Sequence, residues 1–452
     1  MTAGTVENRA LFIIGGLALA AMLNVSYVVF VSQFYAYTGF DLDPSIIKMA
    51  EAHLWLLLLL AIVPAAVHRP SDFLISYFLL LAILPTLLLY GLGDRDRASL
   101  YIMLAGFSVM LLVAYGLPRV RIPFLKEGPM IGVVLSFAAI GGVMLWIFAQ
   151  GAGRYFNLDL LQIYQYRSDV AELVNVGSLA YAVSMVVKAV PGVLLVWALL
   201  RRLWLVAIAL VLCQIVFFSV LAHKSILFGI FLVMLVYLMF LTRRPMLALI
   251  SFFIGLICLC FLAFLIFGDI VAMSVFIRRL FFVTAHLNFE YYSFFGERQF
   301  VFLSDSSFFG WLMPYPYDEP PPALIGEFMG TGGNANNGFL ATGYMHFGIA
   351  GVVVYSAIAG LLLRLADWFT GPERPVWFGI GAVIMPFHTL MTGSDLTVTL
   401  LTHGLGLALV LLWMLGRGRW RTADTPVRRS RVGIADARLG PRVGLADGQG
   451  AQ

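Results

Sequence analysis

Charged residues are scarce in this sequence: Asp, Glu, Lys and Arg together make up 12% of its 452 residues. A soluble domain of this length needs roughly 25% charged residues to cover its surface, so a soluble globular protein is excluded. Hydrophobic residues take their place at 61%, with a mean hydropathy of +0.93. Apolar runs of about 18 residues or more recur along the chain, which is typical of membrane-spanning helices. The sequence therefore predicts an all-α fold, a polytopic membrane helix bundle.

Cysteine is almost absent. The three cysteines, Cys213, Cys258 and Cys260, all lie in apolar runs, which excludes a disulfide framework. The spacing of Cys258 and Cys260 does not suit a zinc site. The chain also lacks a glycine-rich phosphate loop, which argues against ATP-driven transport. We therefore expect no metal and no cofactor, and we expect no nucleic-acid partner.

Runs of about 20 apolar residues between helix breakers indicate where the chain crosses the membrane. They predict twelve spans, near residues 11–32, 51–67, 71–92, 99–116, 129–150, 178–200, 203–221, 225–242, 247–268, 338–364, 376–391 and 396–415. A further apolar helix is expected over 272–295. Arg278 and Arg279 near its start make it a poor span, because a lipid-facing arginine at mid-bilayer costs roughly 2.5–3.5 kcal/mol.

The basic residues predict the orientation of the bundle. With a cytoplasmic N-terminus, nineteen of the 29 Lys and Arg residues fall in the short inner loops and the tail. Both termini are then cytoplasmic, and the two long connections, 151–177 and 269–337, lie on the outer face. Residues 1–416 form the transmembrane domain. The basic tail 417–452 has no apolar period, so we expect it to be disordered and to associate with anionic membrane lipids.

The outer connection 269–337 carries most of the polar residues with chemical potential. A spacing of about 100° per residue places Arg279, Val283, His286 and Glu290 on one face of the helix 272–295, with Arg278 beside it. Arginine offers a planar fork to phosphate oxygens, and His286 or Glu290 could take a proton as the catalytic group. The alternative is an interfacial amphipathic helix whose His286 and Glu290 simply pair.

The same connection ends in a glycine- and asparagine-rich run that includes Asn334, Asn336 and Asn337. Glycines let the backbone approach a ligand, amides bind hydroxyls or phosphate, and the following helix presents its N-terminus to anions. A plain Asn/Gly helix cap is the alternative. The prolines of segment 314–322 exclude a helix or a ladder strand there, which predicts an ordered loop over the outer face.

The outer connection 151–177 brings Arg154, Tyr164, Tyr166 and Arg167 together with acidic residues. Aromatic faces stack on sugar rings and charged groups bind their hydroxyls, although an interfacial aromatic belt has the same composition. Between two spans, residues 223–225 form a tight outer turn that offers Lys224 to a ligand or leaves it hydrated.

Further polar residues lie within or beside the spans. These are Lys188, His346, His388, Asp395 and His403. Each alone is typical of a polar residue satisfied between helices, and the set as a whole would also suit a proton-relay transporter.

The run Asn336-Asn337-Gly338-Phe339, followed by Gly343-Tyr344, Phe347-Gly348 and Gly351, resembles the Wzy-like oligosaccharide repeat-unit polymerases, which are the O-antigen polymerases of bacterial surface glycans. The late outer loop and the glycine- and asparagine-rich entry to a span also look like that family. Residues 223–225, and 164–167 in the earlier loop, sit where the family carries basic and polar residues.

The resemblance implies a multi-pass glycosyltransferase of the bacterial inner membrane that acts in lipopolysaccharide biosynthesis at the periplasmic face. A growing glycan would leave its undecaprenyl pyrophosphate carrier for a fresh lipid-linked repeat unit, with a chain-length regulator as partner. Such an enzyme needs positive charge for pyrophosphate and a base for the acceptor hydroxyl. The expected base is His286 or Glu290, and the expected substrate-binding residues are Arg154, Arg167, Lys224, Arg278, Arg279, Asn334, Asn336, Asn337 and Tyr344.

Two alternatives stay open. An O-antigen ligase would move finished glycan from the same carrier to another acceptor. Ligases place a His-Asn pair at the head of a late helix, where this chain has Asn336-Asn337, and this difference favours the polymerase. A lipid-linked oligosaccharide flippase should show repeated halves and charges at mid-membrane, and the sequence shows no clear internal repeat.

Overall fold

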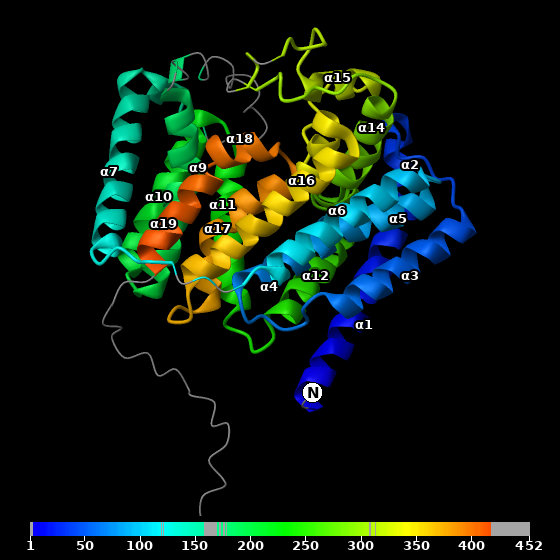
Figure 1. The fold of residues 1–452 in the computed structure, drawn as a ribbon, viewed down its shortest axis with the longest axis horizontal. Coiled ribbons are helices and arrows are strands. Elements are labelled where there is room, and N and C mark those ends of the chain that lie inside the picture. Colours follow the sequence, from blue (N-terminus) through cyan, green and yellow to red (C-terminus); the bar gives the residue numbers. More distant parts are fainter. Residues whose placement is uncertain are drawn as a thin grey trace, which may run out of the picture. The chain divides into compact units, whose positions relative to one another are not determined.

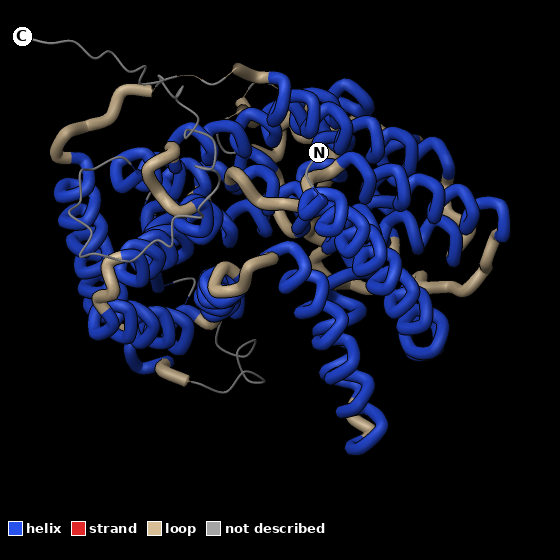
Figure 2. The backbone as a smooth tube through the Cα atoms, turned by 90° about the horizontal axis from the view of Figure 1, so that it is seen from below, coloured by secondary structure: helices blue, strands red, loops and turns tan. Residues whose placement is uncertain are grey.

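The computed structural model describes residues 3–118, 120, 122–157, 170, 173–174, 177, 179–306, 309–311 and 313–416. This part of the chain is built of helices, most of them joined by short links, with a longer loop between α14 and α15, as Figures 1 and 2 show. The predicted tail 417–452 and the predicted site residue Arg167 lie outside the described residues. The predicted all-α bundle is confirmed.

The helices of the first half are α1 (Ala3–Ser26), η1 (Tyr27–Val31), α2 (Ser32–Tyr35), η2 (Ala36–Thr38), α3 (Ile46–Ile62), α4 (Pro70–Phe78), η3 (Leu79–Ile83), α5 (Leu84–Leu92), α6 (Arg97–Gly116), α7 (Gly128–Ala149), η4 (Ala152–Tyr155), α9 (Leu179–Leu200) and α10 (Trp204–Leu221). Those of the second half are α11 (Lys224–Met239), α12 (Pro245–Phe267), α13 (Ile270–Met273), η5 (Ser274–Val283), α14 (Thr284–Gly296), α15 (Pro321–Phe328), α16 (Phe339–Thr370), α17 (Val376–Thr392), α18 (Leu396–Leu401) and α19 (Leu405–Gly416).

Most predicted spans appear as single helices. Among the described residues, nine helical runs are long and apolar enough to cross a membrane, and 224–239, 376–392 and 405–416 form shorter apolar helices. The predicted span 51–67 is shifted toward the N-terminus: the helix there, α3, runs from Ile46 to Ile62. The predicted span 396–415 is broken into α18 and α19 at Gly404, whose φ of +79° is a left-handed conformation that glycine adopts without strain.

The run Ile270–Gly296 is long enough to span, but its contacts keep it at one end of the bundle. His286 contacts the carbonyl oxygen of Thr38 at the end of η2, and Glu290 pairs with Arg95 in the turn between α5 and α6. The last residues of α12, before this run, and the first residues of α16, after it, therefore lie at the same end of the bundle. This end also carries α15, at the top of Figure 1. We call it the α15 end, and we call the opposite end, where α1 begins, the N-terminal end.

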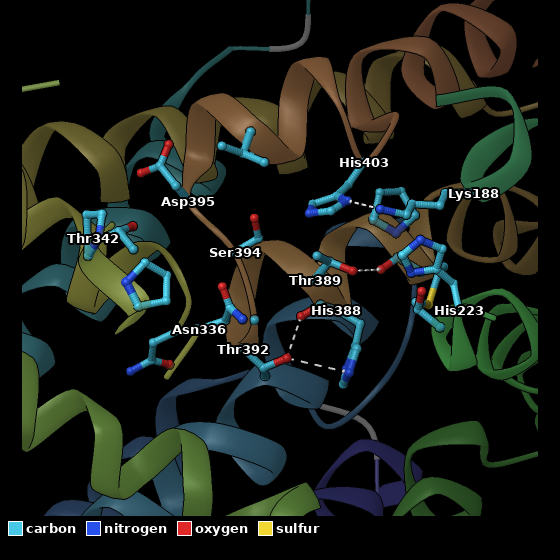
Figure 3. Close-up of a pocket in the computed structure, with 18 of the residues that line it drawn as sticks. Lys188, His223, Asn336, Thr342, His388, Thr389, Thr392, Ser394, Asp395 and His403 are labelled. Atoms are coloured by element: carbon cyan, nitrogen blue, oxygen red, sulfur yellow. Dashed lines mark hydrogen bonds between the residues drawn. The ribbon is translucent and has the colours of Figure 1, made fainter. Parts of the chain in front are cut away.

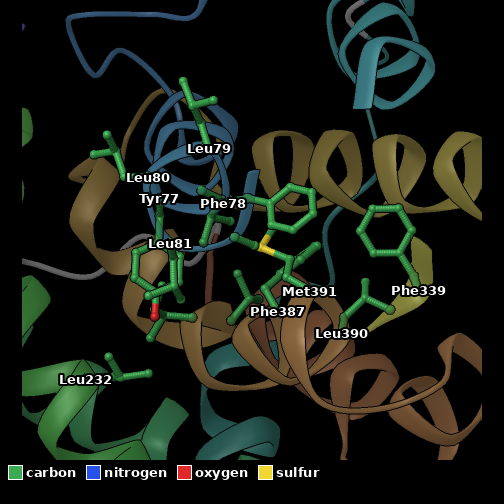
Figure 4. Close-up of a cluster of buried hydrophobic side chains, with 14 of the residues drawn as sticks. Tyr77, Phe78, Leu79, Leu80, Leu81, Leu232, Phe339, Phe387, Leu390 and Met391 are labelled. Carbon is green, nitrogen blue, oxygen red and sulfur yellow. The ribbon is translucent and has the colours of Figure 1, made fainter. Parts of the chain in front are cut away.

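A continuous helical run through α4, η3 and α5 forms the centre of the bundle. The best spanning window of Pro70–Leu92 is fully buried, which explains why it is apolar on every side. Figure 4 shows Tyr77, Phe78 and neighbouring leucines of this run beside Phe339 of α16 and Phe387 of α17. Within a membrane, helices gain little from the hydrophobic effect when they associate, so close van der Waals packing of these side chains stabilises the contact. This packing holds α16 and α17 in place and so positions the loops at the α15 end.

Buried ion pairs join α4 to α16 near the N-terminal end. The carboxylate of Asp367 accepts hydrogen bonds from the backbone N–H and the hydroxyl of Ser71, both at 2.8 Å. Arg364 lies 3.6 Å from the same carboxylate and donates to the carbonyl of Leu117 at 2.7 Å. Since Arg364 and Asp367 are both almost fully buried, each charge depends on the other for stabilisation.

Helix α16 is interrupted at Phe347–Gly348, where Gly348 has a φ of +59°. The break frees the carbonyl groups of Met345 and His346, which accept the backbone N–H groups of Val301 and Phe302. The loop after α14 is thereby fastened to the first half of α16.

The proline run 314–322 departs from the prediction of a loop without helix. Its last two residues, Pro321 and Pro322, open α15, because the first helical positions need no N–H donor.

Candidate functional site

A cavity of about 560 Å³ lies at the α15 end. We call it the main cavity, and Figure 3 shows many of the residues that line it. Its polar lining comes from α9, the α10–α11 turn, the start of α11, α14 and the loop after it, the asparagine run, α16, and the segment from α17 to His403. These polar residues are Lys188, His223, Ser225, Tyr291, Asp305, Asn336, Asn337, Thr342, His388, Thr389, Thr392, Ser394, Asp395 and His403.

One side of the main cavity is basic. Nζ of Lys188 lies 2.6 Å from Nδ1 of His403, and His223 lies on the same side in Figure 3. Because lysine only donates, Nδ1 of His403 accepts, and the ring proton of a neutral His403 is assigned to Nε2. The break at Gly404 brings this pair together, since a Cβ there would lie 3.0 Å from the carbonyl oxygen of Met185 on α9.

The opposite side carries a carboxylate. Asp395 caps α18: its Oδ1 accepts from the backbone N–H of Thr397 at 2.7 Å and from its hydroxyl at 2.6 Å. Oδ2 lies 3.3 Å from Nε2 of His346. Burial raises the pKa of Asp395, but the hydrogen bonds and charge that it receives from His346 and Thr397 outweigh burial and lower the pKa to about 2. Asp395 is therefore a carboxylate at neutral pH.

His346 is fixed in one tautomer behind Asp395. The backbone N–H of Leu303 donates to Nδ1 of His346 at 3.2 Å, so the proton of the neutral ring is assigned to Nε2, which faces Asp395. A second carboxylate, Asp305, lines the same cavity. Asp305 is exposed as a residue, but the loss of water around its carboxyl group is the main cause that raises its pKa; the charge of His346 lowers the pKa and that of Asp395 raises it. The two aspartates of one cavity are thus shifted in opposite directions.

His388 forms a wall of the cavity and is held on both ring nitrogens. Its Nδ1 lies 2.8 Å from the hydroxyl of Tyr77, and its Nε2 lies 3.5 Å from the hydroxyl of Thr392. The Thr392 hydroxyl donates to the carbonyl oxygen of His388 at 2.8 Å. These contacts leave His388 oriented by the protein, which favours a supporting role.

The asparagine run divides into three different environments. Asn336 is exposed and lines the main cavity, as predicted for a ligand contact. Asn337 also lines it, but its amide donates to Oδ1 of Asn288 at 2.9 Å and accepts the N–H of Gly338 at 2.8 Å. Asn337 thus fastens the run to α14. Asn334 is exposed and lies outside the lining of the cavity.

The predicted face of Arg279, His286 and Glu290 does not form. Residues Ser274–Val283 adopt a π-helix, whose hydrogen bonds run to the fifth residue and whose turn is therefore wider than that of an α-helix. The assumed rotation per residue fails over this stretch, so Arg279 is exposed whereas His286 is buried. Arg278 stacks on the ring of Tyr35 at 4.1 Å. Both arginines lie outside the main cavity.

His286 and Glu290 belong instead to a network around Arg95. Nη1 of Arg95 lies 3.2 Å from Oε1 of Glu290, and Nη2 lies 3.3 Å from Nδ1 of His286. Nε2 of His286 contacts the carbonyl oxygen of Thr38 at 3.1 Å. Both ring nitrogens of the predicted base are therefore engaged by the protein.

Glu290 and Tyr344 line a second polar cavity, of about 580 Å³. The ring of Tyr344 stacks on Tyr292 with centroids 4.1 Å apart. Thr342 and Met345 of the same helix line the main cavity. The first half of α16 therefore lies between the two cavities, and Tyr344 contributes to the second one.

Two predicted basic residues, Lys224 and Arg154, do not line the main cavity. Lys224 is exposed at the start of α11, between the lining residues His223 and Ser225. Arg154 is exposed in η4 and stacks on Tyr155 at 5.0 Å.

The sequence placed His388, Asp395 and His403 together around the last outer turn, but it did not relate them to Lys188 or His223. It passed over Asp305, Thr342 and Ser394. A usable signal was present. These polar residues fall where an apolar run begins, ends or is interrupted, and the predicted topology puts all those positions on one face.

The chain contains two Asp-x-Asp sequences, a pattern that can bind a metal ion: Asp41-Leu42-Asp43 and Asp94-Arg95-Asp96. Asp94 pairs with Lys48 at 2.8 Å, and Asp96 caps α6 by accepting the N–H of Ser99 at 2.7 Å. Within the described residues, no group of three or more His, Cys, Asp or Glu side chains has an arrangement that could hold a metal ion.

Comparison with known proteins gives no family assignment. No protein-family model matches the chain, and no similar protein was found among the curated proteins or the solved structures.

Proposed function

We propose that this protein is a membrane glycosyltransferase that polymerises undecaprenyl-pyrophosphate-linked repeat units at the outer face of a bacterial inner membrane. The observation that carries the proposal is the main cavity. It combines a basic side, a buried carboxylate and amide and hydroxyl groups where the spans end. The excess of basic residues in the short loops of the other face supports an outer position for the α15 end and cytoplasmic termini.

The basic side suits the leaving group. In the transfer, the bond between the anomeric carbon of the growing glycan and the pyrophosphate oxygen breaks, and negative charge builds up on pyrophosphate. Lys188 supplies positive charge there, and His223 and the Nε2–H of His403 supply hydrogen-bond donors. Donors arranged in advance around developing charge are commonly the largest contribution to catalysis.

The carboxylate suits the acceptor. The acceptor hydroxyl of the fresh repeat unit forms the new bond to the anomeric carbon, and its proton must be taken up by a base. Oδ1 of Asp395 is held by Thr397, and Oδ2 lies beside His346, while the hydroxyl of Tyr355 also interacts with this carboxylate. We assign the Asp395 carboxylate as the base and His346 as its positioning residue. Asn336, Thr342 and Ser394 are suited to bind sugar hydroxyls.

The test is a gel of surface glycan from a strain that lacks this gene and is complemented with variants. A polymerase predicts a single repeat unit in place of a ladder in the deletion strain. Asp395→Asn should fail to restore the ladder, whereas Asp318→Asn, an exposed aspartate outside the cavity, should restore it. Loss of all glycan from its final acceptor would indicate the ligase, and an unchanged ladder in the deletion strain would refute the proposal.

A further inference from the structure

A smaller cavity of about 280 Å³ opens beside the main cavity. We call it the side cavity. It lies between the first turns of α9, the last turn of α10 and the first turn of α11. Val183 and Val187 of α9, Leu221 of α10 and Ile226 of α11 form its apolar wall. All four are buried, and Tyr181 lies exposed at its edge.

The two cavities share two residues, Lys188 and His223. The basic side of the main cavity is therefore also the polar end of the side cavity. An apolar wall within membrane-spanning helices is followed by basic side chains and then by a polar cavity. This order suits a molecule with a hydrocarbon chain, a phosphate group next to the chain and a polar group beyond the phosphate.

The depth of the side cavity agrees with a lipid in the outer leaflet. Residues 180–187 cover only the first two turns of α9, about 12 Å of helix at 1.5 Å per residue. Lys188 follows this stretch, so it lies about 12 Å deeper along α9 than Ala180, and a phosphate bound there is held below the level of the lipid headgroups. Tyr181 lies near the start of α9, at the membrane surface, where aromatic residues are typical.

We propose that the side cavity binds the first isoprene units of the polyprenyl chain of the carrier lipid, while Lys188 and His223 bind its diphosphate. The inference rests on the proposed function for the identity of the carrier, and it adds the place where the chain leaves the protein between α9, α10 and α11. The glycan then points into the main cavity, and the rest of the chain extends into the bilayer. Filling the side cavity should weaken binding of the lipid without touching the groups that act on sugar.

The experiment uses the full-length protein in lipid nanodiscs and a photoreactive undecaprenyl diphosphate without sugar. The probe carries its photoreactive group on the isoprene unit next to the diphosphate. Labelled peptides are mapped by mass spectrometry. We expect labels on residues 180–187 and 221–226, displaced by unlabelled undecaprenyl diphosphate but not by dimethylallyl diphosphate at the same concentration. Ile226→Trp and, separately, Val183→Trp should each lower labelling at least about tenfold, a loss of about 1.4 kcal/mol in binding.

Leu205→Trp is the matched control, because Leu205 is exposed on the outside of α10 and the substitution adds the same bulk. It should leave labelling unchanged. Labels elsewhere in the chain, or unchanged labelling in both tryptophan variants, would overturn the inference. Equal displacement by phosphatidylglycerol would also overturn it, since the cavity would then hold ordinary membrane lipid. Because the probe carries no sugar, labelling does not depend on glycan transfer. If the protein is labelled specifically but transfers no glycan in a separate assay with lipid-linked repeat units, the proposed function is contradicted and the lipid site remains.

Discussion

Nε2 of His346, in the first half of α16, lies 3.3 Å from Oδ2 of Asp395, which begins α18. These two residues are 49 positions apart and come from different helices. The break at Gly348 frees the carbonyl groups that hold the loop 301–303, and the N–H of Leu303 then fixes the His346 ring. The orientation of the carboxylate in the main cavity thus depends on a glycine two residues beyond the histidine.

Replacement of Asp395 tests its assignment as the base. Asp395→Asn should lower the rate of glycan transfer by about 10²–10⁴-fold, the usual contribution of a general base. Transfer is measured with purified protein and lipid-linked repeat units. His346→Gln should lower it less and change its pH profile, because a positioning residue acts through Asp395. Full activity of Asp395→Asn would remove this residue from the reaction.

The opposite pKa shifts of two aspartates predict opposite effects on stability. The raised pKa of Asp305 means that its charged form destabilises the folded protein above that pKa. Asp305→Asn should therefore raise the melting temperature at pH 7, but only slightly, because Asp305 is exposed and water screens its charge. The gain should vanish as the pH falls through the raised pKa. The lowered pKa of Asp395, about 2, means that Asp395→Asn should lower the melting temperature at neutral pH. Thermal melts in detergent across the pH range measure the melting temperatures of both variants. If the melting temperatures of the two variants change in the same direction at neutral pH, the prediction is wrong.

Two glycines of the glycine- and asparagine-rich run should respond differently to alanine. A Cβ on Gly338 would overlap the carbonyl oxygen of Met391, whereas a Cβ on Gly333 meets nothing within 4 Å. Gly338→Ala should therefore destabilise the fold by about 1–3 kcal/mol, as overpacking does. Gly333→Ala serves as the control and should be nearly neutral. Equal melting temperatures of the two variants would show that the close approach of this run to α17 is not needed.

The buried pair near the N-terminal end should be important for folding. Asp367→Asn removes the charge that faces Arg364 and weakens the bonds from Ser71, which should cost about 3–5 kcal/mol. The control is Glu7→Gln, which breaks an exposed pair with Arg244 and should change stability by less than about 1 kcal/mol. Unfolding in increasing denaturant compares the two, and a stable Asp367→Asn variant would contradict the prediction.

A comparison of Arg279 with Lys188 tests whether the reaction takes place in the main cavity. Arg279 is exposed and lies outside the main cavity, so Arg279→Ala should retain transfer and change stability by less than about 0.5 kcal/mol. Lys188→Gln should abolish transfer while the protein remains in the membrane at normal levels. If Arg279→Ala abolished transfer and Lys188→Gln retained it, the site would instead lie on the helix face predicted from helical spacing.

Periodicity predicted which segments form helices but failed where the helix type changed. The spans of α1, α6, α7, α10 and α12 follow directly from their apolar runs. The assumed rotation per residue was wrong over Ser274–Val283, because a π-helix is stabilised by packing that the sequence pattern does not reveal. The predicted alignment of Arg279 with His286 depended on that rotation.

The candidate site illustrates a related limit. Asn336 was predicted from its motif and does line the main cavity. Asp395 and His403 are close in the sequence, around the last predicted outer turn, but nothing in the spacing relates Lys188 to them. Their proximity depends on the break at Gly404 and on the packing of α9 against α17 and α19.

The sequence by itself determined that this protein crosses the membrane many times, because only helices satisfy the backbone of so many long apolar runs within lipid. It also determined where the polar connections fall, since charged residues mark the ends of spans. Only the tertiary structure decided which polar residues share a cavity. Contacts between helices far apart in the chain, at Gly348, Gly404 and the buried run α4–α5, fix those positions, and periodicity along one helix carries no information about its neighbours.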